Sequence, residues 1–202
     1  MIEASAAGGR QQPPPLKIRC TSSDCANDLH CFLSTKKLRA ANQAGRCRSC
    51  GADLIDWARV QRRDVRDVAF TFASLRRELV RHHFWHVMID QKAVNYARRK
   101  GRQKLAVATR KRLATSIGKE RPYNDGHQTP LEGSGNPICY SQHATATCCR
   151  RCVEEWHGIP LGRALTDEEL DYLAELAMRY LEERIALSED GERIPPVPRG
   201  SR

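Results

Sequence analysis

The sequence contains no long apolar run. No stretch approaches the roughly 20 apolar residues of a membrane-spanning helix, and the opening segment MIEASAAGGRQQPPP lacks the apolar core of a secretory signal. Leu, Ile, Val and Phe together make only 39 of the 202 residues. That share is about one-fifth, the level at which chains begin to bury too little apolar surface. These absences predict a cytoplasmic protein without membrane contact, whose fold needs stabilisation beyond apolar burial.

Negative charge is scarce in the middle of the chain. Residues 59–121 hold 18 Lys or Arg and only 5 Asp or Glu, and the whole chain carries a net charge of +10. A basic block of this kind is typical of proteins that bind polyanions, because each neutralised phosphate releases counterions. The alternative is a solvated helix face without a partner.

Aromatic residues are nearly absent from the most basic part, residues 95–112, where only Tyr96 interrupts the run. Proteins that bind single strands rely largely on base stacking against aromatic side chains. We therefore expect contacts to the phosphate backbone, with duplex DNA favoured and RNA also considered. The predicted phosphate contacts are Arg98, Arg99, Arg102, Lys104, Arg110, Lys111 and Arg112.

Cysteines are abundant in the first part of the chain. The nine cysteines are an odd set, and several lie in Cys-x-x-Cys pairs, which favours metal ligation over a disulfide framework. Two cysteines separated by four residues, followed later by a Cys-x-x-Cys-Gly pair, resemble a zinc ribbon or treble-clef knuckle. Four thiolates on two turns suit tetrahedral zinc, whereas the structural alternative is buried free cysteines. The predicted ligands are Cys20, Cys25, Cys47 and Cys50, with His30 and Cys31 as substitutes.

A second cluster lies in QHATATCCRRCVEEWHGIP, residues 142–160. Its Cys-x-x-Cys pair is followed by a histidine at the four-residue gap common in zinc sites of two cysteines and two histidines. Zinc is favoured over an iron–sulfur cluster because histidines are present, and a redox role for the adjacent thiols is the other alternative. The predicted ligands are His143, Cys149, Cys152 and His157, with Cys139 and Cys148 in reserve.

The histidine-rich segment RHHFWHVMID is the candidate for catalysis. On a helix, His83, His86 and Asp90 fall on one face, as the ligands of a catalytic metal with an open water position do. The alternative, which we favour, is that His82 and His86 are hydrogen-bonded core histidines. Whether the protein is an enzyme stays open, and the catalytic candidates are His83, His86, Asp90 and the loop residue His127.

The hydrophobic pattern predicts a mainly α fold with small zinc-stabilised β or knuckle elements. Helices are expected over 64–99 and 103–117, with a break at Gly101 and a Gly- and Pro-rich loop over 118–137. Thr166 and Glu169 predict a capping box at the start of a last helix. The expected order is a disordered tail (1–17), a zinc-ribbon-like module of four cysteines (18–56), a basic helical domain with the Cys/His site (57–187) and a second tail (188–202).

The phrase QHATATCCRRCVEEWHGIPLGRALTDEEL resembles an uncharacterised family of small Cys/His-rich proteins from bacteria and phages, a domain of unknown function. Its QHATATCC-x2-C-x4-H motif carries the resemblance, which covers roughly residues 82–184. The resemblance implies a bacterial or mobile-element context and no mechanism. The first Cys-rich module looks like an addition to the smaller members.

Three functions fit these features. The leading hypothesis is a nucleic-acid-binding protein stabilised by two zinc ions. The first alternative is a metal-dependent enzyme acting on nucleic acid, either a nuclease or a base-processing hydrolase. The second is an adaptor whose zinc modules bind protein partners.

Overall fold

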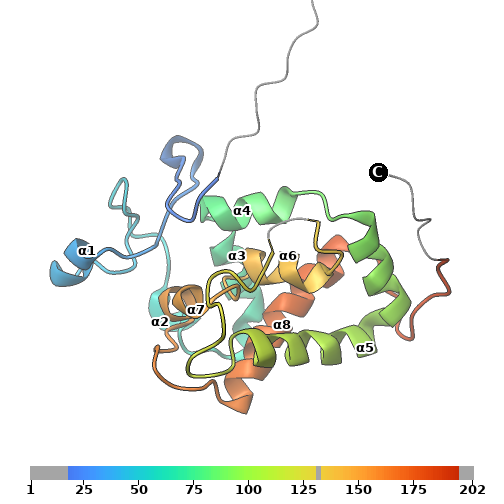
Figure 1. Ribbon diagram of the computed structural model, residues 1–202. Helices are drawn as coiled ribbons and strands as arrows, with labels where there is room; N and C mark the ends of the chain where they lie inside the picture. Colours follow the sequence, from blue (N-terminus) through green and yellow to red (C-terminus); the bar gives the residue numbers. More distant parts are fainter. Residues whose placement is uncertain (1–17, 131–132, 196–202) are drawn as a thin grey trace, which may run out of the picture.

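The computed structural model describes residues 18–130 and 133–195, and within them the regular secondary structure is helical, joined by turns and loops (Figure 1). The predicted tail at 1–17 lies outside the described residues. No helix in the described ranges is both long and apolar enough to cross a membrane. The helices are η1 (Cys25–Asn27), α1 (Lys36–Ala40), α2 (Trp57–Val60), η2 (Val65–Asp67), α3 (Val68–Leu75), α4 (Leu79–His86), α5 (Gln91–Ser116), α6 (Pro137–Ala144), α7 (Arg150–His157) and α8 (Asp167–Arg184).

The segment predicted as one helix over 64–99 is divided into η2, α3, α4 and the first part of α5. The first break follows α3, where Glu78 turns into the interior and is only 2% exposed. The second break follows α4, where the Asp90 side chain caps α5 by accepting from the backbone N–H of Ala93 at 2.9 Å. The apolar spacing runs on through both breaks. The polar residues that interrupt the helix are needed for an interior ion pair and a cap.

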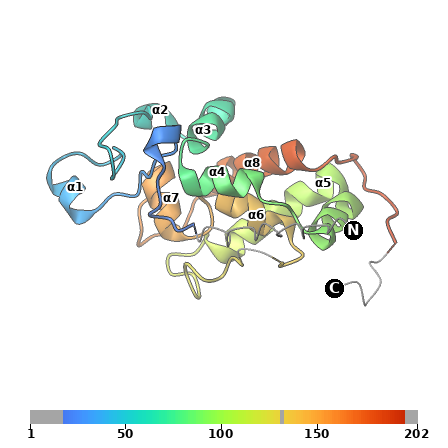
Figure 2. The same cartoon turned by 90° about the horizontal axis from the view of Figure 1, so that it is seen from above.

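Helix α8 lies at the centre of the helical body. It packs against α3, α5 and α6, and α4 packs on α6 (Figures 1 and 2). The predicted capping box is present, because Thr166 and Glu169 exchange side chain to backbone hydrogen bonds. The apolar stripe predicted for this helix is buried, including Leu170, Leu173, Leu176, Ala177, Tyr180 and Leu181. The few aliphatic residues are therefore concentrated around one helix.

Helix α5 bends at Gly101, the position predicted to interrupt it. Gly101 has φ 69° and ψ 172°, a conformation that side chains disfavour. A Cβ at this position would lie 2.2 Å from the backbone nitrogen of Gly191. The Arg102 N–H also donates to the Ser188 carbonyl at 2.8 Å. The first part of the segment predicted as a C-terminal tail thus packs on the bend.

The N-terminal Cys-rich module, residues 18–56, lies at the α7 end of the body (Figures 1 and 2). His30 donates its backbone N–H to the Arg77 carbonyl at 2.8 Å, and its own carbonyl accepts from the Leu79 N–H at 2.9 Å. The Phe32 ring meets the Trp156 ring of α7 with centroids 5.8 Å apart. In place of ribbon strands, the described part of this module has turns, short helices and isolated bridges. Regular backbone pairing therefore contributes little to its shape.

Candidate metal centres

Four side chains of the N-terminal module converge on one point. Their sulfur and nitrogen ligand atoms all lie within 4.8 Å of one another. The separation is 3.7 Å between the two sulfurs of Cys25 and Cys47, and 3.5 Å between Cys50 Sγ and His30 Nδ1. Zinc with sulfur ligands at about 2.3 Å in a tetrahedron requires separations of about 3.8 Å. The group that could hold a metal ion is Cys25, His30, Cys47 and Cys50.

The turn that carries Cys47 and Cys50 favours the thiolate form of Cys47. It is closed by the Gly51 N–H, which donates to the Cys47 carbonyl at 2.8 Å. Burial raises the pKa of Cys47, but hydrogen bonds from nearby backbone amides outweigh burial and lower the pKa to about 6. In contrast, burial and the neighbouring thiols raise the pKa of Cys25 to about 11. Since the thiolate is the form that binds metals, a metal would find Cys47 ionised and would displace a proton from Cys25.

His30 is oriented by its second ring nitrogen. Its Nε2 lies 3.0 Å from Oδ1 of Asp28, and Nδ1 faces Cys50. Metal-ligating histidines usually place a carboxylate or carbonyl on the distal nitrogen, which fixes the tautomer. Burial lowers the pKa of His30, but Asp28 and the neighbouring thiols outweigh burial and raise it. This arrangement matches a metal ligand.

Cys20, a predicted ligand of this site, does not lie in the group. His30, considered as a substitute from the sequence, takes that place. Cys20 instead lies in a turn whose carbonyl accepts from the Cys31 thiol at 3.2 Å. The signal that identifies His30 is its spacing from Asp28, because a carboxylate two residues away can reach the distal nitrogen of the ring.

A second group of sulfurs lies at the start of α7. The sulfurs of Cys148, Cys149 and Cys152 all lie within 4.8 Å of one another, and those of Cys148 and Cys152 are 3.6 Å apart. Cys149 caps α7, and its sulfur accepts from the Cys152 N–H at 3.4 Å. One helical turn therefore brings three thiols to one point. Sulfurs this close fit a single ion, whereas the cysteines of an iron–sulfur cluster are divided between two or more iron atoms.

A buried ion pair lies beside the second group. Arg81 Nε and a Glu78 carboxylate oxygen are 2.9 Å apart, and both side chains are 3% exposed. Arg81 also donates to Cys152 Sγ at 3.3 Å and to the His143 carbonyl at 2.7 Å. Burial lowers the pKa of Arg81, but the negative charges of Cys152 and Glu78 raise it well above its usual value. Hydrogen bonds from the neighbouring thiols, with the Arg81 charge, lower the pKa of Cys152 well below its usual value.

Glu78 links three parts of the chain. Besides Arg81, it accepts hydrogen bonds from the Phe32 N–H at 3.3 Å and from Trp156 Nε1 at 2.8 Å. Burial raises the pKa of Glu78, and the Arg81 charge and the Trp156 hydrogen bond oppose that rise. The carboxylate therefore joins the N-terminal module to α4 and α7 at a buried point.

The two histidines predicted as ligands of the second site lie elsewhere in the core. His143 Nε2 donates to the Thr129 carbonyl at 3.1 Å, and His157 Nε2 donates to the Thr145 carbonyl at 3.0 Å. Burial lowers the pKa of each to about 4. Both are therefore neutral at pH 7 and part of the packing. Cys148, predicted as a reserve, is in the group instead.

A family model described as a domain of unknown function, DUF4186, matches residues 69–182, more than half of the chain. The chain belongs to the DUF4186 family. This match confirms the resemblance to an uncharacterised family and begins upstream of the range expected from the sequence. The DUF4186 region contains the second cysteine group, and the first group lies before it. No solved structure matches the chain.

The DUF4186 region does not bring the predicted catalytic residues together. His83 and His86 lie on α4, but Asp90 lies beyond its end and caps α5. His86 is exposed and its ring lies tilted against that of His82 with centroids 4.1 Å apart, so it is not a core histidine either. His127 is exposed in the loop. Among the described residues, the groups that could hold a metal include none of these side chains.

Most of the predicted phosphate-contacting arginines have partners within the described part of the chain. Three of them form ion pairs with acidic residues of α8 or of the segments next to it, and one reaches a carbonyl of the long loop. The pairs are Arg98 with Glu192 (2.6 Å), Arg102 with Glu182 (2.6 Å), Arg110 with Asp167 (2.7 Å) and Asp171 (2.5 Å), and Arg112 with the Gln128 carbonyl (2.6 Å). Acidic residues thus neutralise one side of α5.

Another side of α5 keeps its charge. Lys100, Lys104 and Lys111 line an open groove of about 490 Å³. Val107 lies between them and is 71% exposed. In the described part of the chain, the ion pairs of α5 are made by arginines and none by these lysines. We call Lys100, Lys104 and Lys111 the lysine side of α5.

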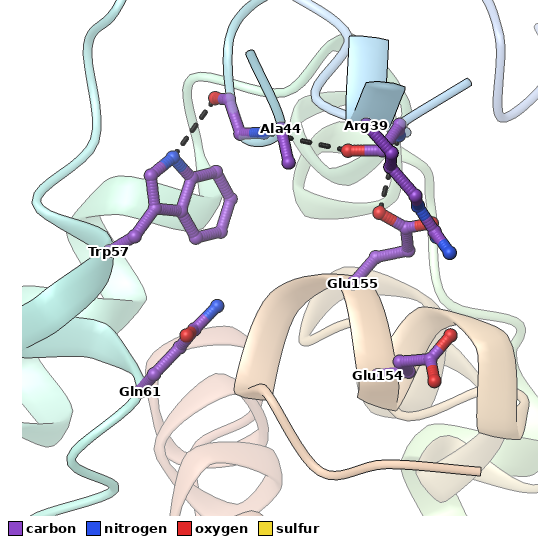
Figure 3. Close-up of a pocket in the computed structure, with 8 residues that line it drawn as sticks. Arg39, Ala44, Trp57, Gln61, Glu154 and Glu155 are labelled. Atoms are coloured by element: carbon purple, nitrogen blue, oxygen red, sulfur yellow. Dashed lines mark hydrogen bonds and ion pairs between the residues drawn. The ribbon is translucent and has the colours of Figure 1, made fainter. Parts of the chain in front are cut away.

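A cleft of about 350 Å³ separates the N-terminal module from α7 (Figure 3). Trp57 and Gln61 line it from one side, and Glu154 and Glu155 of α7 line it from the other. Glu155 forms an ion pair with Arg39 across the cleft. The two carboxylates of Glu154 and Glu155 would repel a phosphate group, so this cleft does not suit a nucleic-acid backbone.

Proposed function

We propose that the protein binds nucleic acid through the lysine side of α5 and that zinc stabilises its fold. The observation that carries the proposal is the division of charge on α5. The arginines on one side are paired with acidic residues, whereas Lys100, Lys104 and Lys111 have no such partner among the described residues. An unpaired row of cations along one groove is suited to a polyanion.

Zinc is supported by the ligand chemistry of both groups. Ligand separations of 3.5–3.7 Å agree with the roughly 3.8 Å edge of a tetrahedral zinc–sulfur site. The imidazole of His30, with Asp28 on its distal nitrogen, adds a ligand that zinc accepts readily. We therefore expect zinc to hold the ligand-bearing turns of the N-terminal module and the start of α7.

The expected binding mode is contact with the phosphate backbone. Lysine is a point charge without the fork geometry that reads base edges, so binding should depend weakly on base sequence. The one aromatic ring in the basic run, Tyr96, lies 5.2 Å from Lys100 Nζ. With so little ring surface for stacking, duplex DNA is the favoured ligand and duplex RNA the comparison.

The test is the triple variant Lys100→Gln, Lys104→Gln and Lys111→Gln, with affinity for labelled duplex DNA and duplex RNA followed by fluorescence anisotropy over a salt series. Loss of three phosphate contacts should reduce the slope of log K against log salt by about 2.7. A matched control removes the same charge from three exposed lysines elsewhere: Lys36, Lys37 and Lys119. The control should keep the slope within about 1 of wild type.

Two outcomes would refute the nucleic-acid proposal. One is the absence of binding to either duplex at low salt. The other is an equal loss of affinity in the triple variant and its control, which would show only a net-charge effect. Elemental analysis of the purified wild-type protein tests zinc separately, and iron or no metal would refute that part.

A further inference from the structure

The second cysteine group is incomplete as a zinc site. Structural zinc is almost always bound by four protein ligands in a tetrahedron. The group at the start of α7 offers three, Cys148, Cys149 and Cys152, and no fourth donor of the described residues lies within it. A donor from a neighbouring segment is therefore required to close the site.

Cys20 lies beside this group. It lines a small cavity together with Arg81 and Cys152, the residues that also contact each other. Burial raises the pKa of Cys20, the charge of Arg81 lowers it and the charge of Cys152 raises it, as expected for a thiol facing both. Cys20 is thus a neighbour of the second cysteine group, whereas its sulfur is not among the ligand atoms of the first.

The other side chains of the cavity that could bind a metal already have partners. Glu78 accepts hydrogen bonds from Phe32, Arg81 and Trp156. Glu155 forms an ion pair with Arg39. In contrast, the described residues give the Cys20 sulfur no hydrogen-bond partner, and Cys20 is a free thiol on an exposed residue. Cys20 is therefore the ligand of this cavity that is still available for a metal.

We propose that Cys20 is the fourth ligand of a second metal site, completed by Cys148, Cys149 and Cys152. The inference rests on the proposed binding of zinc. The metal would join the N-terminal module, which precedes the DUF4186 region, directly to α7 inside that region. Four thiolates around a divalent ion leave an excess of negative charge, and the buried Arg81 guanidinium, in contact with two of the sulfurs, offsets part of it.

The experiment uses the full chain with Co²⁺ in place of zinc, because thiolate-to-cobalt charge-transfer absorbance rises with the number of cobalt–sulfur bonds. The variant is Cys20→Ser, with Cys139→Ala as the control, since Cys139 lies outside both groups. Wild type should take up two cobalt ions. Cys20→Ser should lose charge-transfer absorbance and bind the second ion at least about tenfold more weakly, and the control should match wild type.

Rescue distinguishes ligation from folding. Cys20→His supplies a nitrogen donor at the same position and should restore affinity for the second ion without restoring the full charge-transfer absorbance. Wild-type absorbance and affinity in Cys20→Ser would overturn the fourth ligand while leaving the two-metal protein intact. Uptake of a single ion by wild type would overturn the second site itself. Neither result depends on nucleic-acid binding, which the lysine variants test separately.

Discussion

Replacing Glu78 by glutamine tests whether the buried ion pair holds the fold together. The carboxylate accepts from Arg81 at 2.9 Å, from Trp156 at 2.8 Å and from Phe32 at 3.3 Å, and its side chain is 3% exposed. Glutamine keeps one acceptor oxygen, but its NH2 group then faces one or more of the N–H groups that now donate to the carboxylate. Breaking a buried pair by removing one charge costs about 3–5 kcal/mol.

The expected loss for Glu78→Gln lies near the lower end of that range. Arg81 keeps a second negative neighbour, because Cys152 Sγ lies 3.3 Å from its guanidinium. A loss of about 3 kcal/mol should lower the melting temperature by about 6–12 °C in a chain of this size. Urea denaturation of the metal-loaded full chain at pH 7 measures the free energy of unfolding.

The control is Glu182→Gln, which removes the partner of Arg102 from a pair whose side chains are 36% and 51% exposed. Exposed pairs contribute at most about 1 kcal/mol, so this variant should stay close to wild type. If Glu78→Gln cost no more than Glu182→Gln, the ion pair would not stabilise the contact between the N-terminal module and α7.

Three further changes test other features. Gly101→Ala should destabilise the protein by about 2–4 kcal/mol, because the added Cβ would lie 2.2 Å from the backbone nitrogen of Gly191. Gly126→Ala, also at positive φ but in open space, should lose only about 1 kcal/mol in the same denaturation assay. Acid should lower the free energy of unfolding of the wild type between pH 6.5 and about 4. Burial lowers the pKa of His143 and His157 to about 4, so over this range the unfolded chain binds protons that the folded chain excludes. His143→Gln should show a smaller fall in unfolding free energy over that range. Chelation of the metal should increase proteolytic cleavage within 18–56 more than within 91–116, and added zinc should reverse it.

Equal losses in the two glycine variants would contradict the close packing at the bend. An identical pH dependence in His143→Gln and wild type would contradict a buried neutral histidine. Protease resistance of residues 18–56 after complete metal removal would contradict a module shaped by its ligands.

The sequence predicted the features that depend on local spacing. The capping box of Thr166 and Glu169 and the break at Gly101 are present, because each follows from residues close together in the chain. The breaks on either side of α4 were missed, because Glu78 and Asp90 interrupt the helix for partners that lie far away in sequence.

The candidate metal ligands show the same limit. Cys47 and Cys50 share one turn and were identified from spacing alone. His143 and His157 were predicted as ligands beside Cys152 but lie outside its group, and spacing does not reveal that their ring nitrogens face backbone carbonyls. The lysine side of α5 depends on which arginines α8 neutralises, and only the packing of the two helices reveals that.

The position of Glu78 also bears on the order in which the protein folds. Its hydrogen-bond donors come from residues 32, 81 and 156, so the full set forms only after segments distant in sequence have met. Contacts of that kind are commonly absent from the folding transition state. Loss of the carboxylate should therefore accelerate unfolding while leaving the refolding rate nearly unchanged. The buried pair would then act mainly on how long the native state persists.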